Sequence, residues 1–188
     1  MLLSGSLRRG STNTALLRTA QVAAPESVAT TFYEGANDLP HFNPDLDFEP
    51  LRPAVVALRA GIGSVDCVLI STPEYAGALP ASLKNVLEWA VGDGQTGSIY
   101  EKPVAWVNVS ASPTGAADAH ESLRKVLAYL HALIVEAACV AIPVTRDQVG
   151  DDGLIIEPLI RTKVAGILDT LAAFVREHAA EHSIQNLG

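Results

Sequence analysis

The stretch that decides the fold lies at the start of the chain and reads Leu3-Ser4-Gly5-Ser6-Leu7-Arg8-Arg9-Gly10-Ser11-Thr12-Asn13. A short apolar segment breaks there into glycines, hydroxyl side chains and two arginines, and a helical pattern follows. Hydroxyls, unpaired backbone N–H groups and the positive end of a helix all favour bound phosphate, and glycine lets the backbone approach it closely. The stretch is therefore predicted to be a phosphate-binding loop that leaves a parallel strand and opens a helix.

The composition is that of a folded globular protein, with 188 residues, 48% of them apolar and 18% charged. This length suits one domain with a substantial core, so residues 1–188 are predicted to form a single domain. The net charge of -8 argues against a nucleic-acid-binding protein, because that affinity rests on Lys and Arg that neutralise phosphates. An anionic ligand would need local positive charge, which Arg8 and Arg9 offer.

The N-terminal residues lack the charged lead and long apolar core of a signal peptide, and no stretch has the apolar length of a membrane span. We therefore expect a cytoplasmic protein with no membrane partner. Cys67 and Cys139 lie in separate apolar runs, which predicts buried free thiols rather than a disulfide. The five histidines show no metal-ligand spacing, so no metal site is expected.

Apolar runs alternate with helical patterns along the chain. The predicted strands are 1–4, 28–33, 65–71, 103–109 and 138–144, and the predicted helices are 12–24, 53–60, 80–91, 116–133 and 158–181. This alternation predicts right-handed βαβ units, and therefore a five-stranded parallel sheet with helices on both faces, a three-layer α/β sandwich. Because the first strand is so short, we expect the phosphate loop to be held chiefly by the helix that follows it.

Two doubly wound strand orders compete for this pattern. The dinucleotide-binding order requires G-x-G-x-x-G after the first strand, and residues 5–10 lack the middle glycine. The flavodoxin-like order 2-1-3-4-5 fits better, and it brings the loops after strands one, three and four together. A second match, Gly92-Asp93-Gly94-Gln95-Thr96-Gly97, follows a helix and precedes a strand, so it is not predicted to bind a dinucleotide.

Other phosphate-binding and hydrolytic sites need residues that this sequence does not contain. The Gly-Lys-Ser/Thr of a Walker site never occurs, and the first loop has no cysteine for a thiol phosphatase. No Gly-x-Ser-x-Gly elbow of a serine hydrolase is present. A simple helix-capping turn stays open as an alternative for the first loop, because Ser, Thr and Asn favour caps.

Three later stretches join the first loop to make a family resemblance. They are Pro73-Glu74-Tyr75, then Pro80-x-x-Leu83-Lys84-Asn85 with Trp89, and then Lys102-Pro103-Val104. Together with Ser4-Gly5-Ser6-Leu7-Arg8 and Ser11-x-Asn13, they resemble the NADPH-dependent FMN reductase family of flavodoxin-like proteins, which includes quinone, chromate and azo-dye reductases. The resemblance spans most of the chain.

The resemblance implies an FMN site built from three loops. The implied cofactor-binding residues are Ser6, Arg8, Ser11, Asn13 and Thr14 for the phosphate, Pro73, Glu74, Tyr75 and Gly77 for the isoalloxazine ring, and Ser110, Ser112 and Gly115 in the third loop. Two positions depart from the family pattern. Ala76 stands where Asn usually follows Pro-Glu-Tyr, and Gly115-Ala116-Ala117-Asp118 replaces a common Gly-Gly pair.

The resemblance also implies an FMN-dependent NAD(P)H oxidoreductase. Such an enzyme passes hydride from NADPH or NADH through FMN to a small acceptor, which is free flavin, a quinone, an azo compound or a metal oxyanion. Because the flavin supplies the hydride chemistry, no catalytic side chain is expected. Members of the family are commonly homodimers or homotetramers, so a homo-oligomer is expected. The alternative is a non-enzymatic flavodoxin-like electron carrier or a flavin-binding regulatory module.

Overall fold

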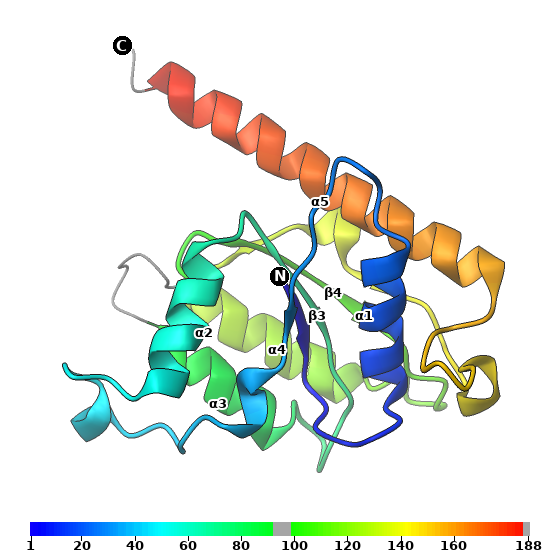
Figure 1. Ribbon diagram of the computed structural model, residues 1–188, viewed down its shortest axis with the longest axis horizontal. Helices are drawn as coiled ribbons and strands as arrows, with labels where there is room; N and C mark the ends of the chain where they lie inside the picture. The colour runs from blue at the N-terminus through cyan, green and yellow to red at the C-terminus, as the bar shows by residue number, and fades with distance from the viewer. Residues whose placement is uncertain (92–98, 186–188) are drawn as a thin grey trace.

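A parallel β-sheet forms the centre of the molecule, with strands in the order β2-β1-β3-β4-β5 and β6 paired to β4 (Figure 1). The computed structural model describes residues 1–91 and 99–185, so the glycine-rich segment 92–97 lies outside the described residues. The strands are β1 (Leu2–Ser4), β2 (Phe32–Tyr33), β3 (Val68–Ser71), β4 (Pro103–Asn108), β5 (Leu133–Ile134) and β6 (Val140–Ala141). The predicted flavodoxin-like order is confirmed.

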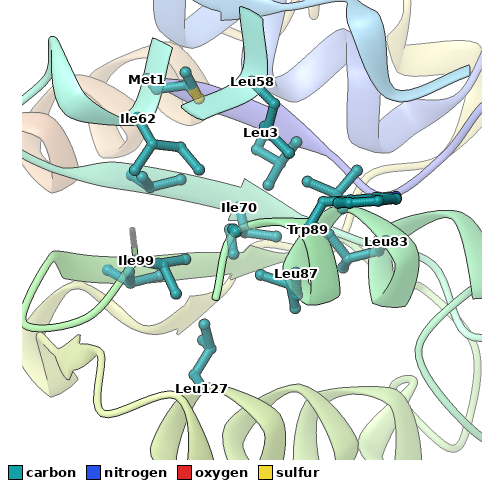
Figure 2. Packing of buried hydrophobic residues seen from close by; sticks show 14 of the residues in the cluster. Met1, Leu3, Leu58, Ile62, Ile70, Leu83, Leu87, Trp89, Ile99 and Leu127 are labelled. Atoms are coloured by element: carbon teal, nitrogen blue, oxygen red, sulfur yellow. The ribbon is translucent and has the colours of Figure 1, made fainter. Parts of the chain in front are cut away.

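Helices cover both faces of the sheet and give the three predicted layers (Figure 1). They are α1 (Thr12–Val22), α2 (Pro53–Gly63), α3 (Ala81–Trp89), α4 (Ala117–Tyr129) and α5 (Pro158–Gln185). Successive strand residues point to opposite faces. Leu2 and Leu69 accordingly pack with α1 and α5, whereas Leu3 and Ile70 pack with α2, α3 and α4 (Figure 2).

Strand β1 is short, yet it is fixed on both sides. It pairs with β2 through Leu2 and Phe32, and with β3 over its whole length. The loop after it continues this attachment, because Gly5 N donates to Ser71 O over 2.8 Å and Ser82 Oγ donates to Gly5 O over 3.2 Å. The expectation that α1 chiefly holds this loop is therefore wrong, since β3 and α3 hold it as well.

The C-terminal edge of the sheet differs from the prediction. The helix predicted over 116–133 ends at Tyr129, and Leu133 and Ile134 form β5, paired with Pro103 and Val104. His131 has a left-handed backbone with φ of 55°, which ends the helical run where apolar spacing continues it. Of the strand predicted over 138–144, only Val140–Ala141 is observed, as β6. A 3-10 turn, Glu136–Ala138, separates β6 from β5.

Other element boundaries move by a few residues. The strand predicted over 28–33 is observed only as β2, and the one predicted from 65 begins at Val68. The long polar loop between β2 and α2 contains two 3-10 turns, Gly35–Asn37 and Pro44–Leu46. Among the described residues, no helix is long and apolar enough to cross a membrane.

Candidate functional site

Four loops enclose a cavity of about 590 Å³ at the carboxyl edge of the sheet. The loops after β1, β3 and β4 converge there as predicted, and the loop after β6 joins them. The predicted site residues that line this cavity are Arg8, Asn13, Pro73, Glu74, Ser110 and Ser112. The remaining predicted residues do not line its wall, and each has a different place in the loops.

Ser6, Ser11 and Thr14 shape the first loop through local hydrogen bonds. Ser6 N donates to Ser4 Oγ over 3.2 Å, and Arg8 N donates to Ser6 Oγ over 3.3 Å. The Ser4 and Thr14 hydroxyls lie 2.9 Å apart, and Ser11 is the N-cap of α1, accepting from Thr14 N over 3.5 Å. These bonds set the turn so that α1 begins at the cavity.

The amino-terminal end of α1 provides donors for an anion. Helical bonding starts with Ala15 N, which donates to Ser11 O over 2.9 Å, so the first-turn N–H groups have no partner within the helix. The helix dipole makes this end positive. Thr12 and Asn13, both in this turn, line the cavity. The arrangement is therefore able to hold a phosphate group by backbone and hydroxyl donors.

Asn13 is also part of the buried structure beneath the cavity. It is 5% exposed, and Ser71 Oγ lies 2.9 Å from its side-chain Oδ1 and 2.8 Å from Val107 O. This network joins α1 to β3 and β4 at the point where the loops leave the sheet. Asn13 therefore has a structural contact with Ser71 and also lines the cavity, where it is available to a ligand.

Glu74, in the loop after β3, is directed at helix α4. Its Oε2 accepts a hydrogen bond from Ala119 N over 3.1 Å, at one of the N–H groups that the start of a helix leaves unpaired. The carboxylate also complements the positive end of the helix dipole. Glu74 therefore joins the second loop to the helix that follows the third loop.

Tyr75 and Gly77 belong to a tight turn at the tip of the second loop. Tyr75 and Ala78 exchange two backbone bonds, of 3.1 and 3.2 Å, and the central residues Ala76 and Gly77 have φ of 51° and 70°. Two positive φ values define a type I′ turn, for which Asn-Gly is the preferred sequence. Ala76 thus occupies a position that favours the asparagine usual in the family. Tyr75 is 48% exposed beside the cavity.

The third loop is braced by Asn108 at the end of β4. Its side chain accepts from Ser110 N over 2.9 Å and donates to Gly115 O. The hydroxyls of Ser110, Ser112 and Thr114 are hydrogen-bonded to one another at 2.8 and 3.2 Å, so they form a row of hydroxyl groups along the cavity. This row is the polar lining of the third loop.

Gly115 and Ala116 end the third loop with positive φ values of 61° and 52°. A Gly-Gly pair adopts this shape without strain, so the chain keeps the backbone of that pair with alanine at its second position. His120 supports this corner, because its Nδ1 lies 2.8 Å from Ala116 O. Since a carbonyl only accepts, Nδ1 carries the hydrogen in this bond.

The wall formed by Val144, Thr145 and Arg146 is absent from the predicted site. The signal was present in the sequence, because a strand predicted to end at residue 144 places the next residues at the same carboxyl edge as the other loops. Thr12, Thr72 and Thr114 were also missed, although each is next to a predicted residue or one position removed from it.

Comparison with known proteins agrees with this geometry. Residues 1–147 match the family described as NADPH-dependent FMN reductase. The chain belongs to the NADPH-dependent FMN reductase family. This membership confirms the sequence-based prediction of a flavin-dependent oxidoreductase with FMN as its cofactor.

Relatives within and beside the NADPH-dependent FMN reductase family extend over nearly the whole chain. A probable NADPH:quinone oxidoreductase 2 of Oryza sativa subsp. japonica is 32% identical over 177 residues, covering 92% of this chain and 86% of that protein. A 2-hydroxy-1,4-benzoquinone reductase from Burkholderia sp is 32% identical over 174 residues, covering 92% and 93%. Among solved structures, the flavoenzyme NAD(P)H:(acceptor) oxidoreductase FerB from Paracoccus denitrificans has a TM-score of 0.80 at 27% identity, covering 94% of this chain and 96% of that one.

Proposed function

We propose that the cavity binds FMN and that the chain passes hydride from NADPH or NADH to a small acceptor, with quinones as the first class to test. The observation that supports this most directly is the wall chemistry of the cavity. One end offers the positive terminus of α1 with the hydroxyl of Thr12, and another offers the hydroxyl row of the third loop. A phosphorylated, polyhydroxylated ligand matches both sets of donors.

The phosphate end of the ligand belongs, in this proposal, to the first loop. An anion needs hydrogen-bond donors, and this end of the cavity offers three kinds. They are the first-turn N–H groups of α1, the Thr12 hydroxyl and the Arg8 guanidinium. Ser6, Ser11 and Thr14 act by fixing this loop, as their local bonds support. Ser11 accepts as a cap, which leaves its own hydroxyl hydrogen for an anionic oxygen.

The ring end belongs to the loops after β3 and β4. Pro73 gives an apolar surface to the cavity wall, Tyr75 is an exposed aromatic at its rim, and Gly77 completes the turn beside it. Ser110 and Ser112 provide hydroxyls, and Gly115 shapes the corner. When bound, FMN supplies the hydride-accepting chemistry, so the side chains of these loops bind and orient it and need not act as general acids or bases.

The proposed acceptor class rests on the two relatives described above, a probable NADPH:quinone oxidoreductase and a 2-hydroxy-1,4-benzoquinone reductase. A homodimer or homotetramer, a cytoplasmic location and a single domain over residues 1–188 stay predictions from the sequence and the family.

The proposed function is tested by mixing the purified protein with FMN and then adding NADPH or NADH without oxygen. We expect the visible absorbance of the flavin to disappear, and to return when benzoquinone is added. Failure to bleach with both nucleotides contradicts the reductase. Tight FMN binding with slow bleaching identifies the alternative, a non-enzymatic electron carrier or regulatory module.

A further inference from the structure

The loop after β6 is a rigid part of the cavity wall. Backbone bonding of the sheet continues beyond β6, because Ile142 N donates to Asn108 O over 2.8 Å and Val144 N to Val109 O over 3.0 Å. Val144 is buried with the core beneath α1 and α5. Thr145 and Gln148 then form a capping box around the 3-10 turn Arg146–Gln148. The backbone position of Arg146 is therefore fixed by the sheet and the buried core just before it.

The same segment is fastened to helix α1. Ile155 N donates to Thr19 Oγ1 over 2.8 Å, and Arg161 Nε donates to Ile155 O over 2.7 Å. In Figure 1 the chain between β6 and α5, coloured yellow to orange, lies beside α1, which it contacts at Thr19. Arg146 lines the same cavity as Thr12 and Asn13 in the first turn of α1. The arginine and the positive end of the helix are therefore both available to one ligand.

The charges near the cavity leave Arg146 available. It is exposed, and no ion pair involves it among residues 1–91 and 99–185. The adjacent carboxylate, Asp147, interacts with the Thr145 side chain, whose hydrogen bond lowers the pKa of Asp147. The other arginine of the cavity, Arg8, donates to Gly10 O within its own loop over 3.1 Å. The Arg8 guanidinium thus bonds to its own loop, whereas Arg146 lines the cavity and forms no ion pair among the described residues.

We propose that Arg146 binds the phosphate of FMN from the loop after β6, as a cofactor-binding residue that the family motifs do not include. The inference rests on the proposed function, because it assigns one more residue to the same site. A planar guanidinium donates two parallel hydrogen bonds to phosphate oxygens, which a single hydroxyl or backbone amide does not provide. It also adds a second positive charge to that of Arg8 in the cavity of a chain whose net charge is -8.

The test compares FMN with riboflavin, which has the same ring and ribityl chain and no phosphate. Equilibrium titrations of flavin fluorescence give the dissociation constants for wild type, Arg146→Ala and Arg146→Lys. We expect Arg146→Ala to raise the dissociation constant for FMN by about 10- to 100-fold and to leave that for riboflavin unchanged. Arg146→Lys keeps the charge without the two parallel bonds, so its affinity for FMN falls between the two.

Arg176→Ala is the matched control, because it removes an exposed guanidinium from α5, away from the site cavity. Its FMN affinity should equal that of wild type, and a thermal unfolding curve checks the fold of every variant. Unchanged FMN affinity in Arg146→Ala overturns the inference, as does an equal loss for FMN and riboflavin. Unchanged FMN affinity with a raised KM for NADPH assigns the arginine to the nucleotide and also overturns it. Wild-type protein that binds no FMN contradicts the proposed function instead.

Discussion

Glu74 Oε2 lies 3.1 Å from the backbone nitrogen of Ala119, so a side chain from the loop after β3 caps the helix that follows β4. The two loops proposed to hold the flavin ring are thereby joined through one carboxylate. Their relative position depends on this bond as well as on the pairing of β3 with β4.

Glu74→Ala removes both the cap and its charge. We expect the free energy of unfolding to fall by about 1–2 kcal/mol, and by a smaller amount in Glu74→Gln, which keeps an acceptor oxygen. Urea unfolding measures both values. Glu121→Ala, an exposed glutamate of the same helix, is the control. Equal stability of Glu74→Ala and wild type would show that the cap contributes nothing.

Ala76→Asn and Ala76→Gly test the turn at the tip of the second loop. A left-handed alanine costs roughly 1 kcal/mol relative to glycine, and asparagine tolerates this conformation better than alanine. Both variants should raise the unfolding free energy by a few tenths to about 1 kcal/mol. Ala78→Gly, outside the two central positions, should not stabilise. A loss of stability in both Ala76 variants would contradict the type I′ turn.

Gly5→Ala tests the close approach of the first loop to β3. A Cβ at this position would lie 2.3 Å from Thr72 Oγ1 and 2.7 Å from Thr72 Cβ, and the strands fix both backbones. We expect a loss of about 1–3 kcal/mol in stability and weaker flavin binding, because the loop must shift. Thr72→Ala removes Oγ1, the atom nearest to the added Cβ. The double variant Gly5→Ala with Thr72→Ala should therefore be more stable than Gly5→Ala alone. An unaffected melting temperature in Gly5→Ala would reject the contact.

Tyr33 has a buried hydroxyl with no hydrogen-bond partner among the described residues. Burial, together with the nearby Asp38 carboxylate, raises the pKa of Tyr33 to about 12. Tyr33→Phe removes an unsatisfied polar atom and keeps the ring, so stability should stay equal or increase by up to about 1 kcal/mol. Thermal unfolding decides this, and a clear decrease would mean that the hydroxyl has a partner in solution.

Cys67 and Cys139 are free, as predicted, and half-buried rather than fully buried. Burial raises the pKa of the Cys139 thiol to about 11 and also raises the pKa of Cys67. Because the thiolate is the reactive form, both thiols should react slowly with an aromatic disulfide reagent at about pH 8 and quickly after unfolding. Rapid reaction of the native protein would contradict this protection.

The raised pKa of Cys139 also has a defined effect on stability. The folded protein retains the thiol proton above the unfolded pKa of about 8.5, where the unfolded chain loses it. The stabilising contribution is therefore complete below about pH 8.5. It is lost as the pH rises toward the folded pKa of about 11. Between about pH 8.5 and pH 11, the free energy of unfolding should fall less in Cys139→Ala than in the wild-type protein. Urea unfolding at a series of pH values measures this difference.

The sequence by itself determined the strand order and the family, and it predicted the phosphate loop. Apolar runs and helical spacing are local properties, and the pair of loops at residues 3–13 and 73–85 is read directly from residue types. Tertiary structure decided that Leu133 and Ile134 form β5 after the end of α4, because their pairing with β4 overrides the helical spacing of residues 130–134. It also decided the place of individual side chains: Ser11 is a helix cap, and Glu74 lines the cavity and bonds to α4. Arg146, which no motif marked, joins the cavity from the loop after β6. The direction of each side chain and the distances between the loops depend on packing across the sheet, which cannot be read from local residue patterns.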